Sequence, residues 1–355
     1  MRLRPRTLAL AATLAVGSAL VAGAAPATAD PDVTLKAATV GRVAGGDRIA
    51  TAIAAAQSFA GGKAKAVVLA RSDNFADSLG AAPLASDKGG PLLLTDRDSL
   101  RADVRAQIDD VLADGGRVYV LGGTSAVSAA VEDQVKSLVG AANVQRVAGG
   151  DRYGTAVEIA KLLPQAKDVA FVTGNNFPDG LSAGALMGVV DKDTNHSLGV
   201  VLLTNDTFMP DVTKNYVNSQ NFAVRVAVGG QAVTAAASAG IQAGALRGAD
   251  RYDTSALVAE QFTSTKFFTD ATTVVGVATG EGWADALSGS ALMAFGGGPM
   301  VLTRPDALPD RSASALRAVA ADARSKESSV SQALVFGGTS VVRSGVDAQV
   351  QAALQ

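Results

Sequence analysis

The chain has 355 residues, of which 48% are apolar and 18% charged, enough for two or three globular domains with sizeable cores. It contains no cysteine, which excludes disulfides, cysteine-ligated zinc and a lipid-modified N-terminal cysteine. Its formal net charge is −2, whereas a nucleic-acid-binding protein would show a basic excess.

The first residues predict a secretory signal peptide. Its three parts are a basic start with Arg2, Arg4 and Arg6, an uncharged apolar run over residues 8–25, and the cleavage signal Ala27-Thr28-Ala29. We expect residues 1–29 to be removed on export; a retained membrane anchor is the less favoured interpretation. Cleavage removes three of the 31 basic residues and none of the 33 acidic ones, which leaves a net charge of −5. No other run is long and apolar enough to span a bilayer, so we expect no membrane association of the mature protein.

After a short lead at residues 30–39, the chain predicts strands that alternate with helices. Short apolar runs rich in β-branched residues are typical of buried parallel strands. They occur at residues 66–70, 91–95 and 117–121, at 169–173, 200–204 and 224–228, and at 273–278, 299–303 and 333–336. This order predicts parallel sheets with helices on both faces, and it leaves the order of the strands open.

Capping residues predict where several helices begin and end. Asp47 stands just before a helical pattern and is a good N-cap. The apolar stripe of residues 99–113 predicts a helix that Gly115-Gly116 terminates. A further helix is predicted to begin directly at the turn that follows residues 117–121.

One stretch recurs three times along the chain. Residues 42–51 read RVAGGDRIAT, residues 146–155 read RVAGGDRYGT, and residues 247–254 read RGADRYDT, a form that is two residues shorter. A fixed period of about 100 residues predicts three structural units, each of domain size. We place them at residues 40–140, 141–244 and 245–355. The second unit carries an insertion at residues 191–197 around His196, the only histidine.

Three coupled motifs, G-x-D-R-Y-x-T, [FW]-x-D-x-L-S and strand-Gly-Gly-Thr, resemble the cell wall binding repeat 2 family from about Val40 to the end of the chain. The resemblance implies an α/β fold of three tandem Rossmann- or TOPRIM-like parallel-sheet modules in an intramolecular pseudo-threefold arrangement. It implies non-covalent attachment of a secreted protein to cell-wall polysaccharide or a teichoic-acid-like anionic polymer, at the cell wall or cell surface, without a cofactor. Two departures are Ile49 in place of the repeated tyrosine and Ala249 in place of the second glycine.

The aspartate and arginine of the repeated stretch have structural and binding interpretations. The aspartates are predicted to be helix N-caps: Asp47, Asp151 and Asp250. The arginines are predicted either to form ion pairs between repeats, which we slightly favour, or to bind a phosphate or carboxylate of the polymer: Arg48, Arg152 and Arg251.

Glycine-rich turns follow the third predicted strand of each repeat. They are Gly122-Gly123-Thr124, Gly229-Gly230 and Gly337-Gly338-Thr339. We predict that their backbone N–H groups lie at a helix N-terminus, where they favour anions without a basic side chain. A tight turn that needs glycine for its conformation is at least an equal alternative. None is a G-x-G-x-x-G or Walker loop, so nucleotide binding is not indicated.

An aromatic residue and an aspartate open the second helix of each repeat. The aromatics are candidate sugar-stacking platforms, although core packing is the commoner fate: Phe75, Phe177 and Trp283. The aspartates are more simply first-turn acids favoured by the helix dipole than catalytic groups: Asp77, Asp179 and Asp285. His196 has no metal-ligand spacing and no G-x-S-x-G elbow accompanies it, so we predict neither a metal site nor catalytic residues.

We therefore expect a binding protein rather than an enzyme, because the repeats occupy nearly all of the chain and their acids come in threes. It would be a monomer with internal pseudo-threefold symmetry that binds no nucleic acid. Two alternatives remain open. One is a peptidoglycan hydrolase or amidase-related wall enzyme, and the other is an architectural surface or adhesion protein.

Overall fold

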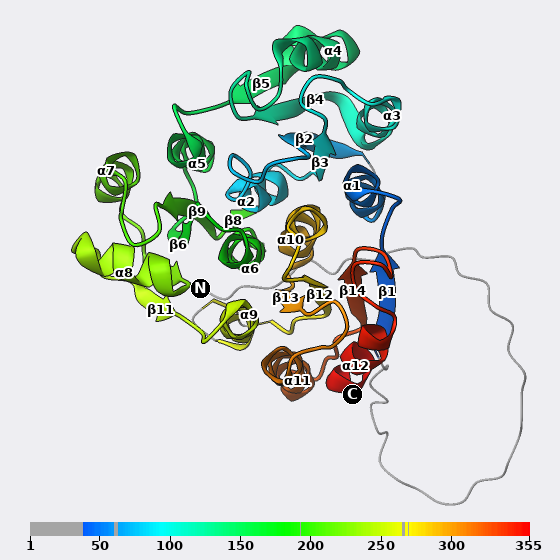
Figure 1. Ribbon diagram of the computed structural model, residues 1–355, viewed down its shortest axis with the longest axis vertical. Helices are drawn as coiled ribbons and strands as arrows, with labels where there is room; N and C mark the ends of the chain where they lie inside the picture. The colour runs from blue at the N-terminus through cyan, green and yellow to red at the C-terminus, as the bar shows by residue number, and fades with distance from the viewer. Residues whose placement is uncertain (1–37, 60–62, 192, 265–266, 269) are drawn as a thin grey trace, which may run out of the picture.

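The computed structural model describes residues 38–59, 63–191, 193–264, 267–268 and 270–355, so the predicted signal peptide lies outside the described residues. Strands and helices alternate along the chain (Figure 1), which confirms the predicted α/β class. Across the described ranges, no helix combines the length and the hydropathy needed to cross a membrane.

Twelve strands of the described chain form three four-stranded sheets in which every pair is parallel. The first sheet has the order β3 (Leu92–Thr95), β2 (Ala64–Arg71), β4 (Leu112–Leu121), β5 (Val144–Val147). The second has β9 (Gly199–Thr204), β6 (Asp168–Thr173), β10 (Val224–Val228), β11 (Gly244–Leu246). The third has β13 (Met300–Thr303), β12 (Val274–Thr279), β14 (Gln332–Phe336), β1 (Thr39–Val43). All nine predicted strands are confirmed; β1, β5 and β11 were not predicted.

These three additional strands link the repeats to one another. Strands β1 and β5 include the first two residues of a repeated stretch and β11 ends just before one, yet β5 pairs with β4 and β11 pairs with β10 of the preceding repeat. The N-terminal strand β1 pairs with β14, in register from Thr39 opposite Gln332 to Val43 opposite Phe336. The blue and red ends of the ribbon therefore lie side by side in Figure 1. The sheets cross the repeat boundaries read from the sequence, and β1 closes the three units into a ring.

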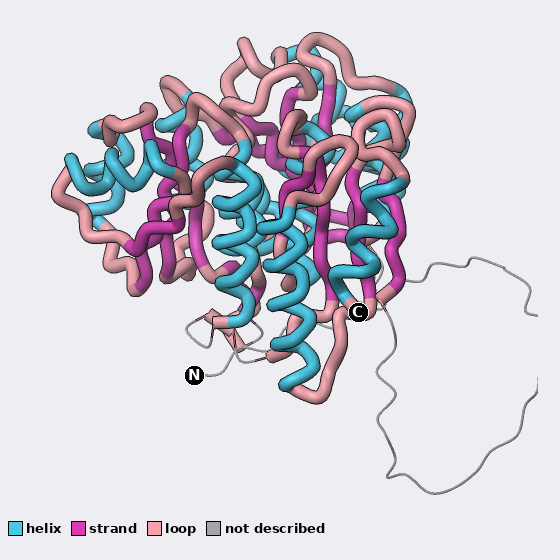
Figure 2. Tube along the Cα trace, turned by 60° about the horizontal axis from the view of Figure 1, so that its bottom comes forward, coloured by secondary structure: helices cyan, strands magenta, loops and turns pink. Residues whose placement is uncertain are grey.

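Helices pack on the sheets and against one another. Their bounds are α1 (Arg48–Gln57), α2 (Ala81–Asp87), α3 (Ala102–Val111), α4 (Ala129–Val139), α5 (Arg152–Lys161), α6 (Pro178–Met187), α7 (Asp211–Ser219), α8 (Gly230–Ser238), α9 (Arg251–Glu260), α10 (Ala284–Gly296), α11 (Asp310–Ser325) and α12 (Gly345–Leu354). The short helices η1 (Ala141–Asn143) and η2 (Gln261–Thr263) are of the 3₁₀ type. In Figure 2 the helices lie beside the strands of all three sheets.

The second helix of each repeat lies at the centre of the molecule. Helix α10 packs against both α2 and α6, and α2 packs against α6 (Figure 1). These helices are rich in small buried residues, which allow close approach. A Cβ added to Gly188 would lie only 2.7 Å from the Cβ of Ala294. The predicted pseudo-threefold arrangement is thus built on three helices rich in alanine, glycine and serine.

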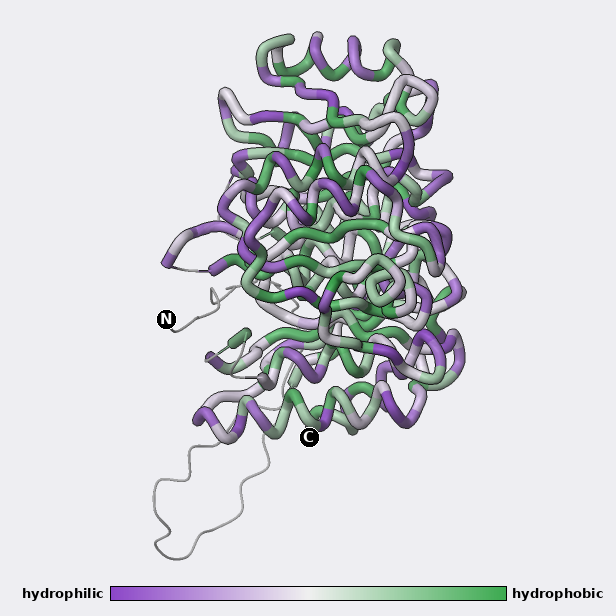
Figure 3. The backbone as a smooth tube through the Cα atoms, turned by 90° about the vertical axis from the view of Figure 1, so that its left-hand side faces the viewer, coloured by the Kyte–Doolittle hydropathy of each residue, from purple (hydrophilic) through white to green (hydrophobic). Residues whose placement is uncertain are grey.

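The strands supply much of the core. Every residue of β6, β9 and β12 is buried, as continuous apolar parallel strands require. Figure 3 shows hydrophobic stretches in the interior and hydrophilic residues mainly along the outer helices and turns.

Two predicted helix ends are wrong. Helix α3 ends at Val111 rather than at Gly115-Gly116, because Leu112 is already extended and pairs with Ala64 as the start of β4. The glycine turns of repeats one and three do not run directly into a helix, since α4 begins only at Ala129 and α12 only at Gly345. Only α8 begins at its turn, at Gly230.

Candidate functional site

The repeated stretch forms a tight loop that connects a strand of one sheet to a helix packed on the next. Each aspartate is the N-cap that we predicted: Asp47 accepts from the N–H of Ala50, and Asp151 from that of Gly154. Asp250 accepts from the N–H groups of Tyr252 and Asp253. The cap fixes the first turn of α1, α5 and α9 and so sets where the following arginine points.

A glycine and a threonine of the same stretch close this loop. The N–H of Gly45, Gly149 or Gly248 donates to the buried hydroxyl of Thr51, Thr155 or Thr254, at 3.1 Å in all three copies. A Cβ on Gly149 would lie 2.5 Å from the Cα of Gly154, so the loop needs glycine here. A Cβ on Gly150 would meet nothing within 4 Å. This open space explains how Ala249 replaces the second glycine in repeat three.

The motif arginines bind main-chain carbonyl groups just beyond the first strand of their own repeat. Arg48 donates to the carbonyl of Ser72 at 2.9 Å, and Arg152 donates to that of Gly174 at 2.5 Å. Arg251 donates to the carbonyl of Gly280 at 2.5 Å. The ion pairs between repeats that we slightly favoured are thus replaced by charge-assisted bonds to the backbone.

Two of these arginines also reach the aromatic residue of a neighbouring repeat. The guanidinium carbon of Arg48 lies 5.7 Å from the ring centre of Trp283, and that of Arg251 lies 5.8 Å from the ring centre of Phe177. These distances are within the range of cation–π attraction. The arginines therefore connect repeat one to repeat three and repeat three to repeat two.

The three predicted aromatic residues meet one another between the repeats. Phe75 lies 5.8 Å from Phe177 and 6.1 Å from Trp283 between ring centres, both edge-to-face. All three are half-buried. The structure thus brings together residues more than 200 positions apart and gives them a packing role.

The departure at Ile49 has a local explanation. In repeats two and three the tyrosine ring packs on a glycine, since a Cβ on Gly174 or Gly280 would lie 3.0 or 2.7 Å from the tyrosine Cε1. In repeat one the glycine is replaced by Ser72, and the smaller Ile49 fills the tyrosine position with 3% of its surface exposed. Tyrosine thus occurs where glycine leaves room for its ring, and isoleucine occurs where serine replaces that glycine.

The glycine turns lie at the carboxyl edges of the sheets. The N–H of Gly122, Gly229 or Gly337 donates at 2.9 Å to the last residue of β5, β11 or β1. All three have positive φ, from 84° to 102°, so the alternative of a turn that needs glycine is confirmed. Ligands of parallel α/β sheets bind at this edge, where strand order is interrupted.

The aspartate of the central helix packs against each glycine turn. A Cβ on Gly122 would lie 2.6 Å from Asp77, one on Gly229 2.6 Å from the carboxyl carbon of Asp179, and one on Gly337 2.8 Å from Asp285. Asp179 and Asp285 lie in the first turns of α6 and α10, as predicted, whereas Asp77 precedes α2.

Two cavities open where a glycine turn faces the repeated stretch of the next repeat. The first, of about 490 Å³, lies between Gly229-Gly230 and the loop with Asp250 and Arg251, over Asp179. The second, of about 430 Å³, lies between Gly338 and the loop with Asp47 and Arg48, over Asp285. We call them the 2/3 junction and the 3/1 junction; the corresponding contact between repeats one and two is the 1/2 junction. Sequence reasoning found the residues of both walls but not that they come from different repeats.

Burial changes the acidity of the aspartates beneath these cavities. It raises the pKa of the Asp179 carboxyl to about 6, against the attraction of the Arg251 charge. Burial also raises the pKa of Asp285, opposed by a hydrogen bond from Thr51 and by the charge of Arg48. A carboxyl that resists ionisation weakens the negative potential at the cavity floor.

The insertion of repeat two lies apart from these cavities. It forms a hairpin of β7 (Val190–Asp191) and β8 (His196–Ser197). Nδ1 of His196 lies 3.0 Å from the carboxylate of Asp87 on α2, which also accepts from the N–H of Ser197 at 2.9 Å. The histidine that we expected in a polar loop thus attaches repeat two to repeat one.

The chain is similar in sequence to two characterised bacterial proteins. It is 27% identical over 275 residues to N-acetylmuramoyl-L-alanine amidase LytC of Bacillus subtilis (strain 168), which covers 76% of this chain and 51% of the amidase. It is 34% identical over 145 residues to the amidase enhancer of that organism, covering 41% of this chain and 20% of the enhancer. The chain thus spans about half or less of the length of these relatives.

Solved structures share the fold, and a family description covers most of the chain. Cwp6 from Clostridium difficile superposes with a TM-score of 0.74 at 22% identity, covering 90% of this chain and 48% of that one. Cwp8 from the same organism superposes with a TM-score of 0.72 at 24% identity, covering 89% of this chain and 51% of that one. Residues 42–132, 146–238 and 245–347 each match Cell wall binding domain 2 (CWB2). The chain therefore belongs to the cell wall binding domain 2 family, with three tandem copies.

Proposed function

We propose that this protein attaches non-covalently to anionic polymers of the cell wall, and that the cavities between its repeats hold the polymer. The observation that carries the proposal is the recurrence of one arrangement at two junctions. In each, a glycine turn at the carboxyl edge of one sheet faces an arginine-bearing loop of the next repeat across an open cavity.

The two walls supply complementary contacts for a sugar chain with negative charges. Main-chain N–H groups of a glycine turn donate to oxygen atoms of any ligand that approaches closely, and the guanidinium group adds positive charge. The small size of the glycines lets a bulky chain lie against the backbone. Several moderate sites on one rigid ring gain affinity through effective concentration, because a polymer bound at one site is held near the next.

In this proposal, residues 30–355 are exported and act as a monomer at the cell wall or cell surface. Membership of the cell wall binding domain 2 family supports this location. The matched relatives carry names of an amidase and an amidase enhancer, and the chain aligns with only 51% and 20% of them. Shared wall attachment accounts for that partial likeness without shared catalysis.

A wall hydrolase is the second candidate, and one observation favours it. A buried carboxyl with a pKa near 6, such as Asp179, resembles a general acid of glycoside hydrolysis. Such chemistry needs a second carboxylate free to act as nucleophile or base. The other carboxylate lining that cavity, Asp250, is engaged as a helix cap. We therefore favour binding without catalysis.

Co-sedimentation with purified cell walls tests the proposal. We expect residues 30–355 to pellet with intact walls and to remain in solution when the anionic polymers have been stripped from them. Equal binding to both preparations would contradict an anionic ligand, and failure to bind either would contradict wall attachment. A cleared band on a wall-substrate gel would favour the hydrolase instead.

A further inference from the structure

Two of the three junctions hold an arginine one residue before the end of the additional strand, Arg42 in β1 and Arg146 in β5. Arg42 is held by the carboxylate of Asp347 at 2.7 and 2.9 Å and donates to the carbonyl of Gly337 at 3.1 Å. Arg146 is held in the same way by Glu132 and donates to the carbonyl of Gly122 at 2.7 Å. At the 3/1 and 1/2 junctions this arginine is therefore neutralised by an acid of α12 or α4.

The 2/3 junction lacks this arginine, because Ala245 stands in β11 where Arg42 and Arg146 stand in β1 and β5, and Arg247 occupies the position of Ala44 and Ala148. Helix α8 and the segment up to β11, residues 230–246, contain no acidic residue. Because α8 begins at the turn itself, the carbonyl of Gly229 accepts from the N–H of Val233, whereas the carbonyls of Gly337 and Gly122 accept from Arg42 and Arg146. Arg247 is exposed, lines the 2/3 cavity, and its aliphatic stem passes within 4 Å of where a Cβ on Gly230 would lie. Its charge is thus available to a ligand.

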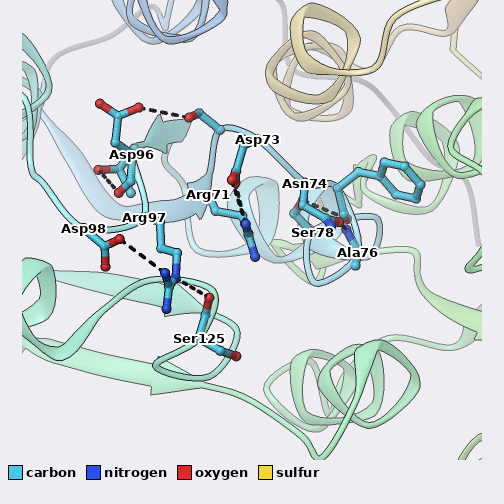
Figure 4. Close-up of polar contacts among 12 residues, drawn as sticks. Arg71, Asp73, Asn74, Ala76, Ser78, Asp96, Arg97, Asp98 and Ser125 are labelled. Carbon is cyan, nitrogen blue, oxygen red and sulfur yellow. Dashed lines mark hydrogen bonds and ion pairs between the residues drawn. The ribbon is translucent and has the colours of Figure 1, made fainter.

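A second position makes the 2/3 junction less acidic than the others. The residue that follows the arginine-bound carbonyl is Asn175 in repeat two, Asp73 in repeat one and Glu281 in repeat three. Figure 4 shows Asp73 engaged by Arg71, at 2.5 and 2.7 Å, in the loop after β2. Glu281 lines the 3/1 cavity.

The charges that line the two cavities differ accordingly. The 2/3 cavity carries two arginines and two aspartates, Arg247 and Arg251 against Asp179 and Asp250. The 3/1 cavity carries one arginine, Arg48, and three carboxylates. The difference of two charges favours an anion at the 2/3 junction.

The 2/3 junction also presents an exposed aromatic ring. Phe208 has 60% of its surface exposed and follows Thr207, which lines the cavity. It is held in a tight turn by reciprocal main-chain hydrogen bonds with Asn205, at 2.9 Å each. Ser99 and Ala307 occupy the corresponding positions of repeats one and three, four residues after the threonine that ends the strand. An exposed aromatic face suits the apolar face of a sugar ring.

We infer that the 2/3 junction is the principal ligand site of the molecule and that it binds an anionic sugar unit, whose charge is held by Arg247 and Arg251 and whose ring packs on Phe208. This inference rests on the proposed function and adds to it that the three repeats are unequal. The 3/1 and 1/2 junctions then act mainly as structural joints, with their first arginines committed to internal ion pairs.

Wall co-sedimentation of single variants tests this inference. Arg247→Ala is expected to weaken wall affinity about tenfold, as loss of a charge-assisted contact to the ligand predicts. Phe208→Ala is expected to weaken it about threefold. The matched control is Arg105→Ala, which removes an exposed arginine of α3 that lines neither of the two cavities and should change affinity less than twofold. Circular dichroism of each variant checks that the fold is retained.

Soluble probes separate the sources of negative charge. A purified wall teichoic acid supplies phosphate, a polyuronate supplies carboxylate and dextran supplies neither; the wild-type protein should bind one or both of the first two and not dextran. If walls are bound but Arg247→Ala and Phe208→Ala bind them like Arg105→Ala, the inference is wrong while wall attachment stands. If the wild-type protein binds no walls, the proposed function itself fails.

Discussion

Gly149→Ala is expected to lower the free energy of unfolding by about 3 kcal/mol, whereas Gly150→Ala should leave it unchanged or raise it by up to about 1 kcal/mol. At position 149 the added methyl group would overlap the backbone of Gly154 and Thr155 at the start of α5. This backbone cannot move aside as the end of a flexible side chain can. At position 150 it enters open space, and alanine restricts the unfolded chain more than glycine does.

Urea unfolding of the two variants, followed by circular dichroism, measures both effects. The denaturation midpoint should fall for Gly149→Ala at an unchanged slope, because the surface exposed on unfolding stays the same. Gly248 and Ala249 form a natural version of this pair in repeat three. Similar midpoints for the two variants would show that the loop tolerates a side chain at its closest approach, contrary to the structure.

Asp179→Asn is expected to stabilise the protein at pH 7 by up to about 3 kcal/mol and to have little effect at pH 4. The folded-state pKa of Asp179 is about 6 and its ordinary value is 3.8, so the folded protein binds the proton more tightly than the unfolded chain does. The buried carboxyl therefore loses stabilising free energy as pH rises from about 4 to about 6. Asparagine keeps the shape and never ionises.

Urea unfolding at pH 4, 5, 6 and 7 gives the difference between variant and wild type as a function of pH. Asp253→Asn serves as the control with the opposite sign, because the hydrogen bond from Arg311 lowers the pKa of Asp253. That carboxylate contributes stability above its unfolded pKa and loses it as pH falls through the lower folded value. A destabilised Asp179→Asn at pH 7 would instead show that the ionised carboxylate supports the turn at Gly229.

Much of the fold follows from local patterns in the sequence. The nine predicted strands are mostly apolar runs, and their burial is what such runs indicate. The N-caps at Asp47, Asp151 and Asp250 follow from residue type and position alone, because a cap depends on contacts within four residues. The period of the repeated stretch supplies the number of units.

The pairing between repeats could not be read in this way. Strands β1, β5 and β11 are short and partly exposed, and polar or glycine residues interrupt them, so they lack the apolar run of the predicted strands. Their partners lie in another repeat, and for β1 nearly 300 positions away. The start of α8 at Gly230 could not be predicted either. Similar Gly-Gly pairs in repeats one and three are followed by several turn residues before the helix begins.

The candidate residues were found, but their grouping was not. The motif analysis names both Arg251 and Gly229, yet only the ring of three units places them across one cavity. Arg247 and Phe208 escaped notice because the sequence search looked for features common to all repeats, whereas these two differ between repeats. The signal that identifies the 2/3 junction is a difference between repeats: Arg42 and Arg146 each have an acidic partner, whereas repeat three has Ala245 at their position and an exposed Arg247 two residues later.

The most direct test of the central claim is a crystal structure of residues 30–355 soaked with anionic fragments released from cell walls. The account predicts density for a sugar unit in the cavity between the Gly229-Gly230 turn and Arg251, with a negatively charged group within hydrogen-bonding distance of Arg247. Density on an outer helix face, with all junction cavities free of sugar, would contradict it.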